Sequence, residues 1–215
     1  MQRSVAMALS LNAGDALVVV DLQADFLPGG ALAVADGDAI VAPIEELSQR
    51  FDSVLLTQDW HTRGHISFAS AHAGHQPFDL IELPYGLQVL WPDHCVMGTP
   101  GAEIVSKPLL TRAQLVIRKG FHPRVDSYSG FQEADRRTVT GLAGYLKERR
   151  FRRLFLVGLA TDFCVGWTAL DARANGFETY VVEDLTRPID TDNSLVRARQ
   201  AMDRAGVRRI SLADI

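Results

Sequence analysis

Short apolar runs rich in β-branched residues recur along this chain, and segments with helical signals separate most of them. Strands that alternate with helices form right-handed βαβ units, whose strands build a parallel sheet covered by helices. We therefore predict a single α/β domain with three layers, in which helices cover both faces of a largely parallel central sheet of about six strands. The predicted strands are 16–20, 53–57, 115–118, 154–158, 179–182 and 208–212.

Four helices are predicted between these strands from apolar stripes and from start and stop signals. Asp36 and Asp38 are candidate caps of the first helix, and the helix that follows Cys164 is expected to end near Asn175–Gly176. The other predictions are a stripe at Ile40, Ile44, Leu47 and Phe51 with Pro43 near the first turn, a helix at about 133–149 striped by Val139, Leu142 and Leu146, and a helix from about 193 to 205.

The composition argues against several classes of function. The net charge is −4 and no basic stripe occurs, so neither nucleic acid nor an anionic membrane is an expected partner. No apolar run approaches the roughly 18 residues of a membrane span. Residues 1–14 are a weak match to a secretory signal and are interpreted as an N-terminal arm that precedes a domain at 15–215. The cysteines, Cys95 and Cys164, form no disulfide framework, so a cytoplasmic location is expected. The sequence leaves open whether the protein is a monomer or a homo-oligomer.

The segment 58–114 has little regular pattern and is rich in Gly, Pro and His. Loops of this length inside compact domains are usually functional or disordered. Because this one carries many potential ligands, we predict that it forms a metal and substrate loop region.

Four chemically reactive residues lie at or just beyond the carboxyl ends of predicted strands. They are Asp21, Asp59, Lys119 and Cys164. In a parallel sheet all of these ends lie along one edge, which is where open α/β sheets bind ligands. We therefore expect the four side chains to converge on one cleft.

Cys164 is expected in the first turn of a helix, where the macrodipole and a nearby Lys119 would lower the pKa of its thiol. The backbone amides of Ala160 and Cys164 could then bind an oxyanion, and Asp21 could move protons. The residues alone leave alternatives open. A free cysteine is often a small buried hydrophobe, and an aspartate at a strand end can simply cap a turn.

A second set combines Asp59, His61 and His94. Two histidines and one carboxylate with open coordination positions suit Fe, Mn or Zn, although a scattered trio can also be surface decoration. The histidines at 72, 75 and 122 are interpreted as solvated, and His65 as a possible neighbour of the ligands.

Five blocks of sequence resemble the nicotinamidase/pyrazinamidase group of the isochorismatase-like cysteine hydrolases. They occur in the family's order and extend from Val18 to Ala172. The blocks are VVVDLQADFLPGGALAV, TQDWHTRGHISFA, LWPDHCVMGTPGAEI, RKGFHPRVDSYSGF and LVGLATDFCVGWTALDA.

The resemblance implies a role for each matching position. Asp21, Lys119 and Cys164 match the family's catalytic triad. The other implied positions are the metal ligands Asp59, His61 and His94, the oxyanion-hole amides of Ala160 and Cys164 with a cis peptide at Leu159–Ala160, and the pocket aromatics Phe26, Trp91 and Tyr128. One position departs from the pattern of some members, because Ser67 stands where they carry another metal-binding histidine. Three protein ligands are therefore expected.

The implied function is a metal-containing cysteine amidohydrolase with one divalent ion, Zn, Fe or Mn. It converts nicotinamide to nicotinate and ammonia, and also pyrazinamide to pyrazinoate, through a Cys164 thioester in NAD salvage. The alternative within the superfamily is an amidase for a carbamoyl or ureido compound, but those relatives generally lack the metal set. Isochorismate hydrolysis fits less well because those relatives lack the nucleophilic cysteine.

Two hypotheses from other classes are weaker. A non-catalytic binding or scaffold protein on this fold would usually have lost part of the triad, and none is lost here. A thiol-redox protein would normally carry a resolving cysteine nearby, whereas Cys95 is far from Cys164 in sequence. Cys95 is interpreted as a packed thiol that could still lie near the metal.

Overall fold

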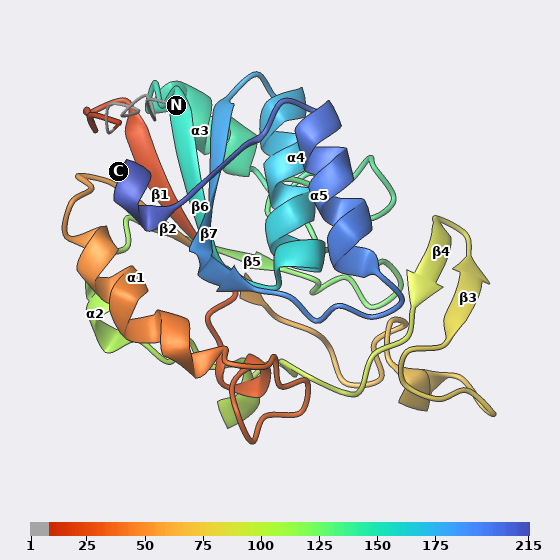
Figure 1. Ribbon diagram of the computed structural model, residues 1–215. Coiled ribbons are helices and arrows are strands. Elements are labelled where there is room, and N and C mark those ends of the chain that lie inside the picture. Colours follow the sequence, from red (N-terminus) through yellow and green to blue (C-terminus); the bar gives the residue numbers. More distant parts are fainter. Residues whose placement is uncertain (1–8) are drawn as a thin grey trace, which may run out of the picture.

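The computed structural model describes residues 9–215, and residues 1–8 of the predicted arm lie outside the described part. Its centre is a six-stranded sheet in the order β5-β2-β1-β6-β7-β8, and every neighbouring pair in that sheet is parallel. Figure 1 shows helices on both sides of this sheet. The prediction of a three-layer α/β domain with about six parallel strands is confirmed.

The elements of the central sheet and its helices follow one another in the expected alternation. Their bounds are β1 Asp15–Val20, α1 Val41–Ser48, β2 Val54–Asp59, α2 Lys107–Arg112, β5 Leu115–Lys119, α3 Leu142–Glu148, β6 Arg153–Leu159, α4 Gly166–Ala174, β7 Glu178–Arg187, α5 Ser194–Arg204 and β8 Arg208–Ile210.

Alternate residues of the central strands feed two separate apolar cores. Leu17 and Val19 of β1 face the core beneath α1 and α2, whereas Val18 and Val20 face the core beneath α3, α4 and α5. Because successive side chains of a strand point to opposite faces, strands buried on both faces must be apolar throughout. The continuous apolar runs of the sequence reflect this arrangement.

The predicted helix at about 133–149 is too long. Only its second half is helical, since α3 begins at Leu142. Val139 of the predicted apolar stripe is 72% exposed. It pairs with Gln132 in an isolated bridge. Gly141 precedes α3 with a φ of 96°, so the chain turns there before the helix starts. Near the C-terminus, α5 agrees with the predicted 193–205 helix to within one residue, so the sequence signals were sufficient to place that helix.

The segment 58–114 contains more regular structure than expected. It holds a hairpin formed by β3 (Leu80–Leu83) and β4 (Gly86–Val89), which projects from the right side of the molecule in Figure 1. It also holds α2, whose start is capped by the Ser106 side chain accepting from Leu109 N–H. A Ser followed by Lys107 and Pro108 is a normal helix start, and this signal was missed.

Other helix boundaries were partly predictable. Neither Asp36 nor Asp38 provides a side-chain cap, since a short 3-10 turn that begins after Gly37 leads into α1. At the end of α4, Gly176 has a φ of 90° and Phe177 N–H bonds to Ala172, so the Asn175–Gly176 stop signal is confirmed. Among residues 9–215, no helix combines the length and apolar character that a membrane crossing needs.

The order in which successive strands are added reverses at β1, which has β2 on one side and β6 on the other. Ligand sites of open α/β sheets form beyond the carboxyl ends of strands at such a switch point. The ends of β1 and β6 approach each other closely here: Gly158 pairs with Val20 and has a φ of 108°. A Cβ atom at residue 158 would lie 2.1 Å from the carbonyl oxygen of Val20.

Replacing Gly158 by alanine should therefore destabilise the domain by about 3 kcal/mol or more, because a backbone contact cannot yield as a flexible side chain can. Gly144→Ala is the matched control. Its Cβ meets no atom within 4 Å in α3, so it should be neutral or stabilising by about 0.5–1 kcal/mol. Urea unfolding of both variants checks this, and similar midpoints for the two would contradict it.

Candidate active site

The four reactive side chains meet at one edge of the sheet, as predicted. Asp21 directly follows β1, while Asp59 and Lys119 are the last residues of β2 and β5 and pair with each other in the sheet. Cys164 follows β6 after a short turn. All four are buried. The parallel topology alone brings together residues that are far apart in the sequence.

Lys119 is the centre of this cluster. Its ammonium nitrogen lies 2.5 Å from Asp59 Oδ1, 2.8 Å from Asp21 Oδ2 and 3.3 Å from the sulfur of Cys164. It also donates to the carbonyl of Ser127 at 3.1 Å. Burial lowers the pKa of Lys119, but the two carboxylates outweigh burial and hold the pKa well above its ordinary value. The ammonium is therefore charged and fully paired.

The two carboxylates are shifted in opposite directions. Burial raises the pKa of Asp59, but the Lys119 ammonium, His61 and His94 together outweigh burial and hold the pKa well below its usual range. For Asp21, burial dominates over the same ammonium, and the nearby Asp59 charge acts with burial, so the pKa is raised. Thr57 also donates to Asp21 Oδ1 at 2.6 Å. Asp59 therefore stays ionised, whereas Asp21 is the carboxylate adapted to accept a proton.

The prediction that the pKa of Cys164 is lowered is wrong for this protein structure. Burial raises the pKa of its thiol well above the ordinary value, and the Asp21 and Asp59 charges add to that effect against Lys119. Cys164 also lies in a π-helical turn at Thr161–Val165 that precedes α4, not in the first turn of an α-helix. The resting thiol is protonated, so the site needs a base.

The turn that carries Cys164 is closed by one carbonyl. Ala160 C=O accepts from the N–H groups of Phe163 and Val165, both at 3.1 Å. The peptide bond between Leu159 and Ala160 is cis, as the resemblance implied. Ala160 and Cys164 both line the adjacent cavity.

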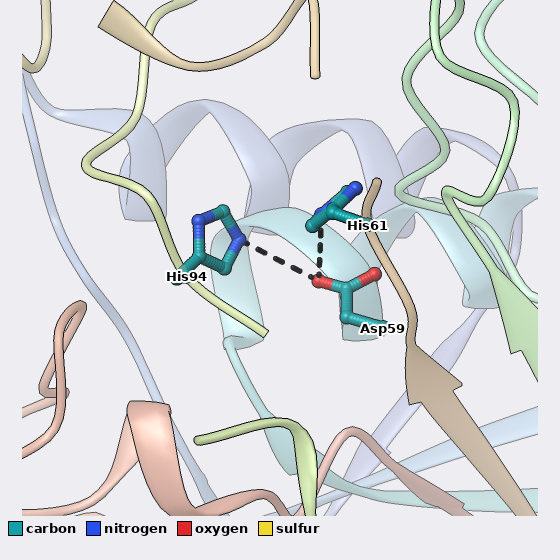
Figure 2. Close-up of side chains that lie close together, drawn as sticks. All are labelled: Asp59, His61 and His94. Atoms are coloured by element: carbon teal, nitrogen blue, oxygen red, sulfur yellow. Dashed lines mark ion pairs between the residues drawn. The ribbon is translucent and has the colours of Figure 1, made fainter. Parts of the chain in front are cut away.

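Asp59, His61 and His94 form a compact group of potential metal ligands (Figure 2). Asp59 Oδ2 lies 3.6 Å from His61 Nε2 and 3.7 Å from His94 Nε2. The Nδ1 atom of His61 bonds to the Gly120 carbonyl at 2.9 Å, and that of His94 to the Pro92 carbonyl at 2.8 Å.

These carbonyl contacts decide which nitrogen faces the group. A carbonyl can only accept, so each Nδ1 carries the ring proton, and each Nε2 faces Asp59, where it can offer a lone pair to a metal when it is unprotonated. With an ionised carboxylate beside them, His61 and His94 fit a divalent metal. Gly120 is essential to this geometry, because a Cβ atom there would lie 2.5 Å from the His61 ring.

His65 lies behind the ligands and is not one of them. Its ring packs on His61 with centroids 4.5 Å apart. Its Nε2 donates to the His122 carbonyl at 2.9 Å, and its Nδ1 contacts the Ser67 hydroxyl at 2.7 Å. Burial, followed by the charge of His61, lowers the pKa of His65 to about 4. Ser67 thus bonds to His65 instead of supplying a fourth ligand.

Within the described residues 9–215, two other groups have metal-like spacing, and neither fits an ion. In the group of His61, His65 and Asp126, both ring nitrogens of His65 are already bonded. In the group of Asp21, Asp59 and Cys164, the Lys119 ammonium already fills the space between the acidic atoms.

A small cavity opens beside Cys164 and the potential metal ligands. Its walls include the three predicted aromatic residues Phe26, Trp91 and Tyr128. The Tyr128 hydroxyl is held by donors from Trp91 at 3.1 Å and Gln88 at 2.9 Å.

Four lining residues were missed at the sequence level: Leu32, Asp126, Phe163 and Ile189. Phe163 packs edge-on against Trp91, with ring centroids 4.8 Å apart. Its position directly before Cys164, and that of Asp126 two residues before Tyr128, gave a usable signal. Leu32 and Ile189 lie in loops whose sequences gave none.

The remaining histidines and the second cysteine are outside the cavity lining. His75 is exposed, as predicted, while His72 and His122 are half-buried. Cys95 is a free, fully buried thiol in the core next to His94. Its N–H donates to Asp25 Oδ2 at 2.7 Å, and burial raises the pKa of its thiol well above the ordinary value. The prediction of a packed thiol is consistent with this placement.

The chain matches the model of the isochorismatase domain over residues 15–213. It is 57% identical over 200 residues to a nicotinamidase of Acinetobacter baylyi, covering 93% of this chain and 94% of that protein. This chain belongs to the isochorismatase family, in its nicotinamidase/pyrazinamidase group.

Solved structures of the family agree. A nicotinamidase/pyrazinamidase of Acinetobacter baumannii superposes with a TM-score of 0.92 at 55% identity, covering 95% of this chain and 99% of the other. A pyrazinamidase of Pyrococcus horikoshii in complex with zinc gives a TM-score of 0.76 at 36% identity, covering 93% and 99%. Yeast nicotinamidase bound to the inhibitor nicotinaldehyde gives 0.86 at 29% identity, covering 92% and 99%.

Replacing Lys119 should show how much the stability of the protein depends on its buried positive charge. Lys119→Met leaves Asp21 and Asp59 buried without their partner, which typically costs about 3–5 kcal/mol. The exposed Lys147→Met serves as the control and should change the free energy of unfolding by less than about 0.5 kcal/mol. Chemical denaturation measures both, and an equal effect of the two substitutions would rule out the central role of Lys119.

Proposed function

We propose that this protein hydrolyses nicotinamide to nicotinate and ammonia, and pyrazinamide to pyrazinoate, within NAD salvage. The observation that carries the proposal is the position of Cys164. Its sulfur contacts Lys119 and lines a cavity that Asp59, His61 and His94 also line. A cysteine nucleophile and a metal-type ligand set in one small aromatic cavity suit an amide attached to a nitrogen heterocycle.

Binding places the carboxamide carbon next to the sulfur. Trp91, Tyr128 and Phe163 supply flat apolar walls for the ring, and Phe26 approaches from the side of His94, with ring centroids 5.5 Å apart. Fixing the amide against the nucleophile converts attack into a step within one complex, which is a large part of the rate enhancement.

The first chemical step forms a bond between Cys164 Sγ and the amide carbon. Asp21, whose pKa is raised, receives the thiol proton, and the Lys119 ammonium stabilises the developing thiolate. The carbonyl oxygen takes up the electron pair of the C=O bond and is held by the backbone amides of Ala160 and Cys164.

The second half of the reaction releases ammonia and frees the enzyme. When the carbon–nitrogen bond breaks, Asp21 passes its proton to the leaving nitrogen, and a thioester of Cys164 remains. A water molecule that gives its proton to Asp21 then attacks the thioester. Nicotinate leaves and Cys164 regains its proton, so the cycle is balanced without a redox partner.

Asp59, His61 and His94 are the residues that would hold a divalent metal. When bound, such an ion would act as a Lewis acid for the pyridine nitrogen and so help to orient the ring. Zinc is the metal of the Pyrococcus relative, and iron and manganese suit the same donor set. The alternative, an amidase for a carbamoyl or ureido compound, gives no role to this ligand set.

Cys164→Ala should abolish ammonia release from nicotinamide, with a loss of at least about 10⁴-fold in kcat, because no other side chain in the cavity can form the thioester. Cys95→Ala is the control, since that thiol lies outside the cavity and should leave turnover unchanged. Ammonia is assayed with purified, metal-analysed protein, and thermal melting verifies the fold. Residual turnover near that of the unaltered enzyme would exclude the covalent mechanism.

His61→Ala should lower the metal content of the purified protein and raise KM for nicotinamide, because it removes one of three ligands. The exposed His75→Ala provides the comparison and should leave both values unchanged. Elemental analysis after dialysis gives the metal content. Unchanged stoichiometry in His61→Ala would show that the ion is held elsewhere.

A further inference from the structure

Gln23 is a fully buried polar residue just beyond β1, and no catalytic step uses it. Its side-chain amide makes three hydrogen bonds to backbone groups. The oxygen accepts from Asp59 N–H at 2.7 Å, and the nitrogen donates to the carbonyls of Asp59 at 2.8 Å and Ala102 at 2.9 Å. One side chain thus satisfies both backbone polar groups of Asp59.

The reason lies in the path of the chain after β1. The last residues of β1 and β2 that pair are Val19 and Leu56. Asp21 then adopts a φ of 47°, which turns the backbone out of the sheet while its carboxylate faces Lys119. The backbone at 21–23 therefore cannot continue the ladder along β2, and the amide of Gln23 takes its place beside Asp59.

The hydrogen bonds from Gln23 affect the orientation of the Asp59 carboxylate. Oδ1 of that carboxylate pairs with Lys119, while Oδ2 faces both His61 and His94. Orientation of a short side chain follows the orientation of its own peptide groups, and Gln23 clamps the groups on both sides of the Asp59 Cα.

We infer that Gln23 is a positioning residue for the metal site, which sets the affinity for the ion by fixing the backbone of Asp59. The inference deepens the proposed function and rests on the ligand assignment made there. Residues that orient metal ligands through hydrogen bonds typically change metal affinity by about 10–100-fold when they are removed.

If Gln23 only stabilised the fold, its loss would affect zinc binding no more than the loss of another buried glutamine. Gln58 provides that comparison. Gln58 is also buried and also donates to the Ala102 carbonyl, at 2.8 Å. Its oxygen accepts from Arg118 and makes no bond to the Asp59 backbone. Gln58→Met therefore removes a hydrogen bond to Ala102 but leaves the two bonds between Gln23 and the Asp59 backbone in place. Gln23→Met removes a bond to Ala102 and both bonds to the Asp59 backbone.

The experiment measures zinc dissociation constants by chelator competition for the full-length unaltered protein, Gln23→Met and Gln58→Met, together with urea unfolding of the metal-free proteins. We expect Gln23→Met to weaken zinc binding by about 10–100-fold and Gln58→Met to leave it unchanged, although both lose stability. Gln23→Glu is included because it keeps the side-chain shape and the acceptor for Asp59 N–H. It should bind zinc more weakly than the unaltered protein even if Gln23→Met does not fold.

Unaltered zinc affinity in the Gln23 variants would overturn the inference, as would an equal loss in Gln58→Met. Absence of zinc binding by the unaltered protein would overturn it together with the ligand assignment. Ammonia release from nicotinamide is measured in parallel to test the proposed function separately. A protein whose zinc affinity depends on Gln23 but that releases no ammonia would retain the inference and lose the proposed activity.

Discussion

The buried ammonium of Lys119 is the interaction on which the site depends. Asp21 and Asp59 are two carboxylates removed from water, and the cost of burying such charges is met only by a close opposite charge with complete hydrogen bonding. Lys119 contacts both carboxylates and the sulfur of Cys164 at once. The proposed nucleophile and the proposed metal ligands are therefore parts of one electrostatic unit, and Asp59 contacts both Lys119 and the two histidines.

The unequal environment of the two carboxylates divides their roles. Asp59 pairs at 2.5 Å with Lys119 and keeps its charge, which suits a ligand. For Asp21, burial outweighs Lys119 and the Asp59 charge acts with burial, so its pKa rises and it can take and return a proton. The thiol of Cys164 is likewise held in its neutral form by burial. In the proposed mechanism, activation of Cys164 therefore depends on proton transfer to Asp21, and not on a thiolate that is present at rest.

Backbone geometry makes this arrangement possible at the switch point of the sheet. Asp21 turns the chain out of β1 with a positive φ, and Gly158 allows β6 to approach the end of β1 without a side-chain clash. Gly120 similarly admits the His61 ring against the backbone after β5. Close approach of strands and rings at these points places Cys164 and the histidines around one cavity.

Strand periodicity and parallel topology follow local and geometric rules, so the sequence alone predicts the three layers, most strands, and the convergence of Asp21, Asp59, Lys119 and Cys164. Through the family resemblance, the sequence also predicted three metal ligands and three pocket aromatics, and the structure places these residues around one cavity. The sequence did not determine the start of α3, the hairpin of β3 and β4, or the pocket residues Leu32 and Ile189, which depend on contacts distant in sequence. The direction of the Cys164 pKa shift follows only from the folded structure. Helix position and a neighbouring lysine argue for a lower value, but burial and the two adjacent carboxylates outweigh them, and the depth of burial is not visible until the chain has folded.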